Sequence, residues 1–536
     1  MRVTLFYAPY PGQRFRGQGL TISPVRVRNP KSALVTLAAG ARKHLAERGV
    51  EARFRIVDAQ VGDAEPQHYA SFPYGPDMID CYRHGGAFES YDDDIRDADV
   101  IGISNNFTNS ARVVADFARH MRRVNPEALL VAGGMDVTAR SEWYLDNGFD
   151  VAVQLEGEVA FARVVESRAR GIPVGSLVRT RGHGAGVVVV GGPPLDLDEL
   201  PPMALDLVAD LSLYDDTGEG TPPPTVRAPF TCFETSRGCH RACAFCATPI
   251  RGRYRYMSPD TVARHFAYFR SAGISNILFQ EDNILSRMQR DGNGSPLHAG
   301  GRDEVLEIFR LARAHGFSWE FANGLEFGKF LDPGHLDEEL MAAMFWSDRS
   351  GERWSGCYRV QLSLEYLGEE PTTRFRKLRS FQEQFEIIRA ILDLGVIYQT
   401  FNVLIGHDED DRAAHDLYLD RCLQLKEELT RHESDATPYF NIFNRTLLPG
   451  TADFRAKADR LEFDIERVPE VVSVYLSPMP SRHLGYYDLL QERLRLTNAL
   501  NGSLIDQYDG THREPGDASP AGRDPATADI TGDITG

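Results

Sequence analysis

The sequence predicts an α/β protein: an N-terminal doubly wound parallel sheet, then a partial (β/α)6 barrel, then a small helical region. Three observations predict this fold. Short apolar segments alternate with amphipathic ones over residues 1–190, a segment rich in Pro and Gly follows at 191–229, and a second alternation covers 230–450. Apolar strands joined by helices are typical of parallel sheets whose helical crossovers cover the sheet. A length of 536 residues gives room for roughly two to four domains.

Within the first domain, five apolar segments are predicted strands and two amphipathic segments are predicted helices. The strands are 3–8, 53–57, 98–104, 128–132 and 151–155, and the helices are 32–47 and 112–124. Ligands of such sheets bind beyond the carboxyl ends of the strands. Gly133, Gly134 and Glu156 follow predicted strands and are therefore candidate binding residues. The alternative for the two glycines is that they only turn the chain.

The second domain repeats the pattern with six predicted strands and four predicted helices. The strands are 230–234, 276–281, 318–322, 359–364, 398–405 and 438–443, and the helices are 259–272, 303–314, 380–394 and 411–428. Six strands of this kind suit a partial barrel with its chemistry at the carboxyl-terminal rim. Residues 451–507 are predicted to be mostly helical. The composition of 508–536 (Gly, Pro, Asp, Ala and Thr) predicts a disordered tail.

Composition excludes several classes of function. A net charge of −18 argues against binding to nucleic acid, which needs clustered Lys and Arg. No apolar run reaches the roughly 18 residues that suggest a membrane span. The first residues lack the apolar stretch of a signal peptide, so a cytoplasmic location is expected. Seven cysteines, an odd number with three of them within eight residues, favour a metal or redox site over a disulfide framework.

The three clustered cysteines are Cys239, Cys243 and Cys246, in the spacing Cys-x3-Cys-x2-Cys. Three thiolates at this spacing can hold three irons of one iron–sulfur cube and leave the fourth iron open. A structural zinc site would normally need four protein ligands. His240 is the candidate for a fourth ligand, but it lies directly beside Cys239. Zinc and three unrelated cysteines remain the alternatives.

This motif, with an aromatic residue before the last cysteine and a strand before the first, resembles the radical S-adenosylmethionine (SAM) enzymes. The resemblance implies a [4Fe-4S] cluster on the three cysteines, with SAM bound at the open iron and cleaved reductively to a 5′-deoxyadenosyl radical. It also places Phe245 near the adenine. At later strand ends it implies that Glu281 and Asp282 face the ammonium group of SAM, that Ser363 and Glu365 lie near the ribose, and that Gly406 packs against the adenine. Read singly, each of these is equally a polar or turning residue at the end of a strand.

Residues 1–190 are similar to the Rossmann-like cobalamin-binding domain that precedes the cysteine motif in one large subgroup of these enzymes. Gly133, Gly134 and Glu156 lie in the most similar stretch. The Asp-x-His-x-x-Gly motif that supplies a lower axial ligand to cobalt in many cobalamin proteins is absent, which leaves that ligand open. The alternative is a fold that has lost its cofactor. Methylthiolation of RNA or protein is excluded because the first domain has only Cys81 for a second cluster.

The resemblance implies a methyltransferase that uses SAM and methylcobalamin on a small molecule, with electrons from an external flavodoxin or ferredoxin. The expected target is an unactivated carbon or a phosphinate phosphorus of an antibiotic or other specialised-metabolite precursor, as in phosphinothricin-type pathways. Basic runs at 251–255 and 374–377 favour an anionic substrate. The alternatives are a radical SAM cyclase or rearrangement enzyme and a non-catalytic metal-binding protein. The sequence assigns no catalytic side chain.

Overall fold

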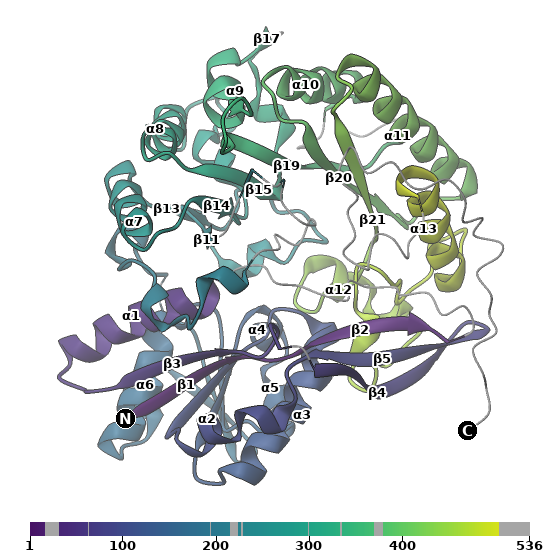
Figure 1. Ribbon diagram of the computed structural model, residues 1–536. Helices are drawn as coiled ribbons and strands as arrows, with labels where there is room; N and C mark the ends of the chain where they lie inside the picture. Colours follow the sequence, from purple (N-terminus) through teal and green to yellow (C-terminus); the bar gives the residue numbers. More distant parts are fainter. Residues whose placement is uncertain are drawn as a thin grey trace.

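The structure is a computed structural model, and it describes residues 1–16, 32–62, 64–192, 194–214, 223, 225–226, 229–298, 300–332, 335–368 and 379–502. It contains two parallel sheets, each accompanied by helices, as predicted. Figure 1 shows the first sheet below and the barrel strands above, with α1 (Ala33–Glu47), α4 (Met135–Ala139) and α12 (Ala452–Lys457) between them. The basic run at 374–377 and the tail at 508–536 lie outside the described residues.

The first sheet has the strand order β3-β1-β6-β7-β8-β10-β9. Its strands are β1 (Arg2–Tyr7), β3 (Arg53–Asp58), β6 (Val100–Ser104), β7 (Leu129–Gly133), β8 (Val151–Val153), β9 (Thr180–His183) and β10 (Gly186–Val189). All neighbours pair in parallel except β9 and β10. The order turns back at β1, which confirms the doubly wound prediction. A crevice at such a reversal is where ligands bind.

Both faces of this sheet are covered. Leu5 and Val131 belong to a core with α1 and α6 (Gly157–Arg170), whereas Phe6 and Leu130 belong to a second core with α3 (Ala111–Val124). Because successive residues of a strand point to opposite faces, two cores require continuous apolar runs. The remaining helices of this domain are α2 (Asp92–Arg96) and α5 (Ser141–Asp146).

A small antiparallel sheet was not predicted. It consists of β2 (Tyr10–Phe15), β5 (Asp77–Gly85) and β4 (Ala64–Tyr74) in that order. Pro66 and Pro73 lie within β4 and argue against a strand, but β4 is at an edge of this sheet, where proline is tolerated. Its apolar side packs on the C-terminal region, and the hydroxyl of Tyr74 donates to the carbonyl oxygen of Ser477 at 2.9 Å.

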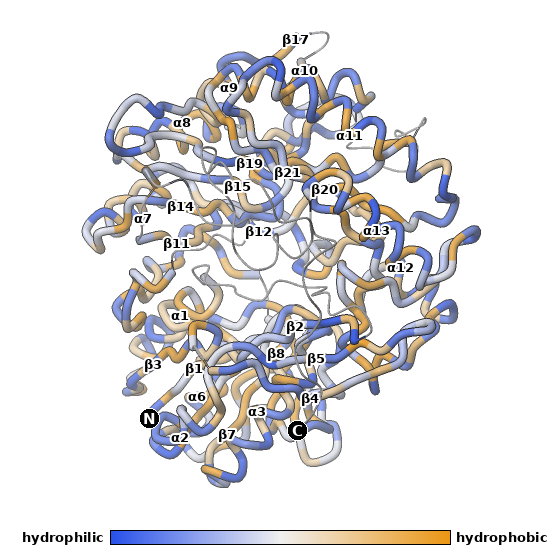
Figure 2. Tube along the Cα trace, turned by 45° about the vertical axis from the view of Figure 1, so that its right-hand side comes forward, coloured by the Kyte–Doolittle hydropathy of each residue, from blue (hydrophilic) through white to orange (hydrophobic). Residues whose placement is uncertain are grey.

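The barrel sheet is parallel throughout its main path, in the order β11-β14-β15-β19-β20-β21. The strands are β11 (Phe230–Phe233), β14 (Asn276–Phe279), β15 (Ser318–Leu325), β19 (Ser355–Glu365), β20 (Tyr398–Ile405) and β21 (Thr437–Asn444). The helices are α7 (Pro259–Ser271), α8 (Gly301–Ala314), α9 (Glu338–Phe345), α10 (Phe381–Asp393) and α11 (Arg412–His432). Figure 2 shows hydrophilic stretches along the outer helices α10 and α11.

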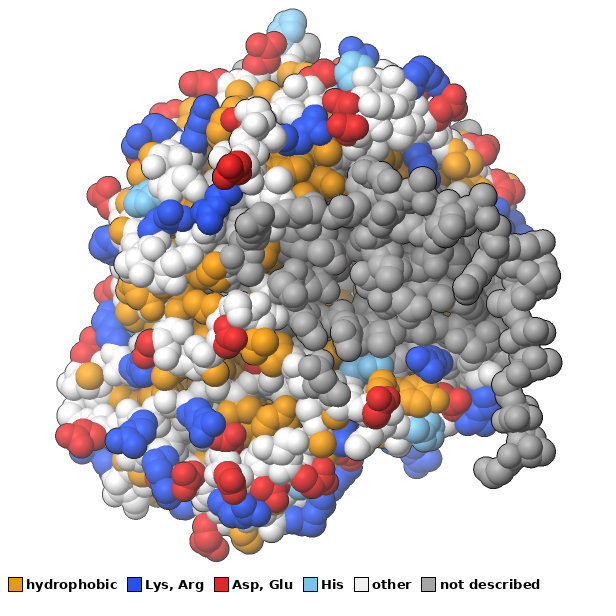
Figure 3. Space-filling view, in the orientation of Figure 1, with side chains coloured by type: hydrophobic (Ala, Val, Ile, Leu, Met, Phe, Trp, Pro, Cys, Tyr) orange, Lys and Arg blue, Asp and Glu red, His pale blue; other side chains and the backbone are white. Residues whose placement is uncertain are grey.

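Beyond the barrel, the described C-terminal region has two α-helices, α12 and α13 (Tyr486–Asn501), and α13 packs on β21 and α11. Residues 461–485 between them are mainly turns and loop, so the region is less helical than predicted. On the face shown in Figure 3, basic and acidic side chains are intermixed. Within the described ranges, no helix is both long enough and apolar enough to cross a membrane.

Candidate functional site

The cysteine loop, defined as residues 238–248, follows β11 and the short strand β12 (Ser236–Arg237). Its three cysteines are unpaired in disulfides and half-buried, whereas the other four cysteines of the chain are buried. Burial raises the pKa of the thiols of Cys81, Cys357 and Cys422. A buried thiol that resists ionisation is a poor metal ligand. The loop cysteines are therefore the thiols of this chain that are placed for chemistry.

Hydrogen-bond donors surround the loop sulfurs. The backbone N–H of Arg241 donates to Cys239 Sγ at 3.3 Å, and that of Thr248 donates to Cys246 Sγ at 3.4 Å. Asn283 Nδ2 and Ser286 Oγ each lie 3.6 Å from Cys239 Sγ. Such donors stabilise thiolates and tune cluster potentials.

No group of three or more His, Cys, Asp or Glu side chains within the described residues has the arrangement that holds a single metal ion. In an iron–sulfur cube, each of three cysteines binds a different iron, so their sulfurs do not converge on one point. The donor set, three thiolates with amide and hydroxyl donors, therefore fits a cluster better than a single ion.

Asp282 binds both ends of the cysteine loop. One carboxylate oxygen accepts the N–H of Gly238 at 2.7 Å, and the other accepts the hydroxyl of Thr248 at 3.1 Å. Arg251 also donates to Asp282, at 2.8 Å. Asp282 was predicted to face the ammonium group of SAM. In the structure its carboxylate fastens the loop.

Glu281 is buried, and burial raises its pKa. One oxygen accepts the N–H and the hydroxyl of Thr235 at 3.0 and 2.7 Å, and the other accepts the hydroxyl of Ser236. These contacts hold the backbone just before the loop. Both carboxylates that were predicted to bind SAM are thus engaged with the chain itself.

The C-terminal region contacts the cysteine loop. The N–H of Asp453 donates to the carbonyl oxygen of Ala244 at 2.9 Å. Gly450 has a φ of +85°, and a Cβ added there would lie 2.9 Å from Ile250 and 3.1 Å from Ala139 of the first domain. A turn at Gly450 therefore lies between the loop and the first domain. Phe245 is half-buried within the loop.

Three predicted SAM-binding residues lie at the carboxyl ends of neighbouring barrel strands. Ser363 is half-buried near the end of β19, and Glu365 ends that strand with a φ of +53°. Gly406 follows β20 with a φ of +80°, and its N–H donates to Asp410 Oδ2 at 3.0 Å. The structure thus brings all three to the rim that also carries the cysteine loop, as parallel strands require.

Sequence reasoning missed a polar cluster on the inner face of the barrel. Asn402 Oδ1 accepts from Gln361 Nε2 at 2.9 Å and from Asn441 Nδ2 at 3.1 Å. Asn402 and Asn441 face each other in the β20–β21 register, and both are half-buried. Polar residues at alternate positions of strands that are otherwise apolar were the available signal.

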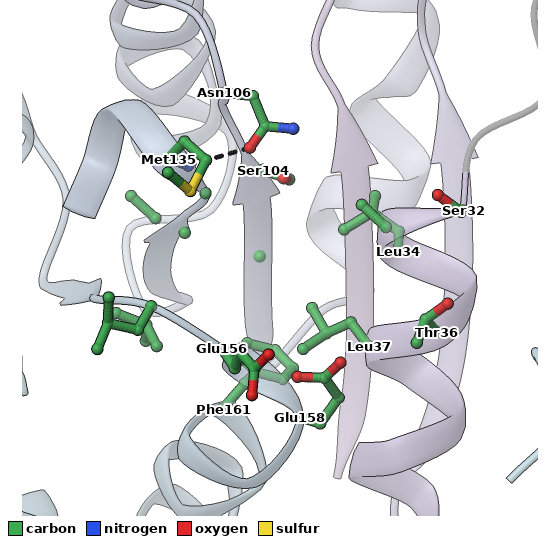
Figure 4. Close-up of a pocket in the computed structure, with 18 of the residues that line it drawn as sticks. Ser32, Leu34, Thr36, Leu37, Ser104, Asn106, Met135, Glu156, Glu158 and Phe161 are labelled. Carbon is green, nitrogen blue, oxygen red and sulfur yellow. Dashed lines mark hydrogen bonds between the residues drawn. The ribbon is translucent and has the colours of Figure 1, made fainter. Parts of the chain in front are cut away.

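A cavity of about 310 Å³ lies at the carboxyl ends of β6, β7 and β8. It also takes lining residues from the start of α1 and, across the domain boundary, from Glu234, Arg237, Arg251 and Gln280. Figure 4 shows Glu158 and Phe161 of α6 and the adjoining Glu156 facing Leu37 of α1. The volume is at the lower end of the range for small-molecule sites. No histidine occurs among the described residues that line it.

The three residues predicted from the first domain, Gly133, Gly134 and Glu156, all line this cavity. A Cβ added at Gly134 would lie 2.3 Å from the carbonyl oxygen of Asn105, and the φ of Gly134 is +112°. Nothing lies within 4 Å of a Cβ added at Gly133. Leu155, half-exposed at the same strand ends, has a φ of +61°. Strained backbone of this kind concentrates at functional sites.

Comparison with known families matches both halves of the chain. The family model described as the radical SAM superfamily matches residues 233–420, and that of the B12 binding domain matches residues 78–165. A cytidylyl-2-hydroxyethylphosphonate methyltransferase from Streptomyces wedmorensis is 26% identical over 298 residues, which cover 50% of each chain. An uncharacterized methyltransferase from Pyrococcus horikoshii is 28% identical over 207 residues, 36% of this chain and 42% of the relative. The chain thus spans half or less of the length of these relatives.

Two solved structures share the fold. The radical SAM methyltransferase TsrM from Kitasatospora setae, solved with cobalamin and a [4Fe-4S] cluster, aligns with a TM-score of 0.53 at 15% identity, covering 84% of this chain and 76% of TsrM. The cobalamin-dependent SAM radical enzyme OxsB, solved with aqua-cobalamin, aligns with a TM-score of 0.53 at 13% identity, covering 93% of this chain and 61% of OxsB. At these identities the similarity concerns the fold alone.

Proposed function

The chain is a radical SAM protein with a B12-binding domain, and from that premise we propose that it is a cobalamin-dependent radical SAM methyltransferase acting on a small molecule. The observation that carries the proposal is that the two sites adjoin. Glu234, Arg237 and Arg251 line the cavity of the first sheet, and they also flank the cysteine loop. Two cofactors bound at these sites would act on one substrate between them.

The residues fit the cofactors that the two domains imply. Cys239, Cys243 and Cys246 would hold the [4Fe-4S] cluster, and Phe245, Ser363, Glu365 and Gly406 would line the SAM site. Gly133 and Gly134 would let the corrinoid approach the strand ends, with Glu156 beside it. When bound, the cofactors supply hydrogen abstraction and a transferable methyl group.

The chain itself contributes position and exclusion of water. The cysteine loop is fixed at both ends by Asp282 and at Ala244 by Asp453. The Asp410 carboxylate holds the turn at Gly406 by accepting the N–H groups of Gly406 and His407, both at 3.0 Å. These contacts keep the rim in one arrangement before any ligand arrives, which lowers the cost of ordering it during the reaction.

For the substrate, we propose a small specialised-metabolite or antibiotic precursor that is methylated on an unactivated carbon or a phosphinate phosphorus. Support comes from the relative whose name specifies a phosphonate substrate. The basic run at 251–255 gives less support for an anionic substrate than the sequence suggested. Arg251 pairs with Glu234 and Asp282, and Arg255 pairs with Glu156, so these two guanidinium groups already have carboxylate partners.

An external flavodoxin or ferredoxin in the cytoplasm would supply the electron, because a radical SAM cluster has to be reduced before each SAM cleavage. A radical SAM cyclase or rearrangement enzyme with the same domains is the alternative, and product mass separates the two. Methylation adds one CH₂ and yields S-adenosylhomocysteine, whereas cyclisation adds no carbon.

The test is anaerobic reconstitution of the full chain with iron, sulfide and hydroxocobalamin, followed by SAM and a reductant. The expected result is 5′-deoxyadenosine formation and, with candidate phosphinates or their carbon analogues, transfer of a labelled methyl group from SAM. Deoxyadenosine with an unmethylated, oxidised product would favour the cyclase. No deoxyadenosine at all, from protein that holds its cluster, would leave only a metal-binding role.

A further inference from the structure

A chain of buried and half-buried ion pairs connects the cavity of the first sheet to the cysteine loop. We call it the ion-pair chain. Its members are Glu156, Glu158, Arg237, Glu234, Arg251 and Asp282. The first two belong to the first domain and the other four to the barrel domain.

At the cavity wall, Arg237 crosses the domain boundary. Its guanidinium lies 2.8 Å from Glu158 Oε1 and 3.1 Å from Glu156 Oε1. All three side chains line the cavity, so a ligand there would touch this end of the ion-pair chain directly. Arg237 also immediately precedes Gly238, the first residue of the cysteine loop.

The remaining links run from Arg237 to the loop. Arg237 Nε lies 2.5 Å from Glu234 Oε1, and the other oxygen of Glu234 lies 3.1 Å from Arg251. Arg251 in turn lies 2.8 Å from Asp282. Asp282 accepts from Gly238 and Thr248, the two ends of the loop. An unbroken series of charge-assisted contacts therefore joins the cavity to the segment that carries the three cysteines.

Burial makes these contacts strong and sensitive to change. The side chain of Arg237 is 6% exposed, and although burial works against its charge, Glu158, Glu234 and Glu156 raise its pKa. Burial also favours the neutral acid at Glu234, but Arg237 and Arg251 outweigh it and lower the pKa of Glu234 to about 2. A buried charge that loses its partner is costly because water cannot replace it. Rearrangement at one end of the ion-pair chain therefore has to be accommodated along it.

We propose that the ion-pair chain couples the two cofactor sites, with Arg237 and Asp282 as positioning residues. An occupant of the cavity that fixes Glu156 and Glu158 also fixes Arg237, and through Arg251 and Asp282 it fixes the ends of the cysteine loop. Binding free energies are reciprocal, so a cluster in the loop strengthens corrinoid binding by the same factor. This inference rests on the proposed function, because it takes cobalamin as the occupant of the cavity and an iron–sulfur cluster as that of the loop.

Arg255 provides a matched comparison. It pairs with Glu156 at 2.6 Å and donates to the carbonyl oxygen of Leu195, and it is not among the described residues that line the cavity. Within the described residues, its side chain bonds to Glu156, Leu195 and Arg253, which lie outside the cysteine loop. Asp282, in contrast, contacts the loop but is not a lining residue of the cavity. Replacing Arg255 therefore weakens the hold on Glu156 but leaves the links from Glu158 through Arg237 to Asp282 in place, whereas replacing Asp282 breaks the last link to the loop.

The experiment measures the Kd of hydroxocobalamin by equilibrium dialysis for the full chain, with and without a reconstituted cluster. For the wild type we expect the cluster to tighten binding about tenfold, within the usual range of coupling between sites. Asp282→Asn keeps the shape of the side chain but weakens its pairing with Arg251, and it should reduce the factor to about twofold or less. Arg255→Gln should leave the factor near its wild-type value.

Two further measurements separate coupling from simple loss of structure. The rate of iron loss to a chelator should slow when hydroxocobalamin is added to the wild type, and it should not respond in Asp282→Asn. Arg237→Gln removes the guanidinium that pairs with Glu156, Glu158 and Glu234 and can fail to fold, so the charge-reduced pair Arg237→Gln with Glu158→Gln serves as the second break in the ion-pair chain. It should lose the coupling while retaining iron.

A wild-type Kd that is the same with and without the cluster overturns the coupling and leaves the proposed function standing. The same conclusion follows if the cluster tightens hydroxocobalamin binding by the wild-type factor in Asp282→Asn or in the double variant. Protein that binds iron but no hydroxocobalamin in either state overturns the cobalamin part of the proposed function together with this inference.

Discussion

The two parallel sheets of this chain present different surfaces to their ligands. In the first sheet, helices cover both faces, and strands such as β1 and β6 are buried almost throughout. In the barrel, β20 and β21 alternate in their carboxyl-terminal halves between buried residues and half-exposed residues of the inner face. The first sheet therefore offers its cavity at the strand ends, lined by glycines and by side chains that follow the strands, such as Glu156. The barrel can also use side chains along its strands.

The largest expected effect tests the barrel side of this comparison, at the cysteine loop on the rim. Cys243→Ala removes one of three thiolates, so the cluster should not assemble and deoxyadenosine formation should fall at least about a hundredfold, equivalent to about 2.7 kcal/mol of barrier or more. Iron content, visible absorption and deoxyadenosine yield measure it. Cys422→Ala, in α11, is the control, because that thiol is buried away from the loop. Wild-type iron content in Cys243→Ala would contradict the assignment of the cluster.

The second prediction tests whether the first sheet depends on its strand-end glycines. Gly134→Ala puts a Cβ 2.3 Å from a carbonyl oxygen, on a backbone with a φ of +112°. We expect a loss of about 2–4 kcal/mol in the free energy of unfolding and weak binding of hydroxocobalamin.

Its control separates backbone strain from steric overlap. Gly148 has a φ of +101°, but nothing lies within 4 Å of an added Cβ. Gly148→Ala should therefore cost only about 1 kcal/mol and leave corrinoid binding intact. Urea unfolding and dialysis measure both variants. Equal behaviour of the two would show that the contact between Gly134 and Asn105 has no special role.

The same contrast explains what the sequence could predict. Both sheets followed from periodicity, and the cysteine motif followed from its spacing, because these signals are local. The strand ends carried Gly133, Gly134 and Glu156, and all three do line the cavity. Their neighbours from the barrel, such as Arg237, had no local signal, because they reach the cavity only through the packing of the two domains.

Glu281 and Asp282 show a second limit. Their position at the end of a strand predicted a place at the ammonium group of SAM, which stays a prediction, and sequence position does not reveal which donors surround a carboxylate. Thr235, Ser236 and Gly238 are 44 to 46 residues away along the chain. The strand β4 was missed for the opposite reason. Its two prolines are a local signal against a strand, but β4 lies at the edge of a sheet, where proline is tolerated.

A third prediction tests the inner face of the barrel. Asn402→Leu deprives Gln361 and Asn441 of their shared acceptor, and we expect it to cost about 1–3 kcal/mol in the free energy of unfolding. Asn441→Leu removes only one donor and should cost less. Urea unfolding of both variants and of the double variant measures the coupling. Iron content should stay at the wild-type level, because in the described part of the chain the side chain of Asn402 bonds to Gln361 and Asn441 and not to the cysteine loop. Additive effects would mean that the three side chains do not act as a cluster.

The smallest expected effect concerns Glu234, which lies where the two surfaces meet, after β11 and on the wall of the cavity. Arg237 and Arg251 overcome the effect of burial and lower its pKa from 4.5 to about 2. A lowered pKa in the folded state stabilises the fold above pH 4.5, and this stabilisation is lost as the pH falls toward 2. Between pH 6 and pH 4 the loss from this one group is about 1 kcal/mol. The urea midpoint of the cofactor-free chain should therefore fall less over this range in Glu234→Gln than in the wild type. A wild-type pH dependence in the variant would mean that the two arginines do not hold this carboxylate in its charged form.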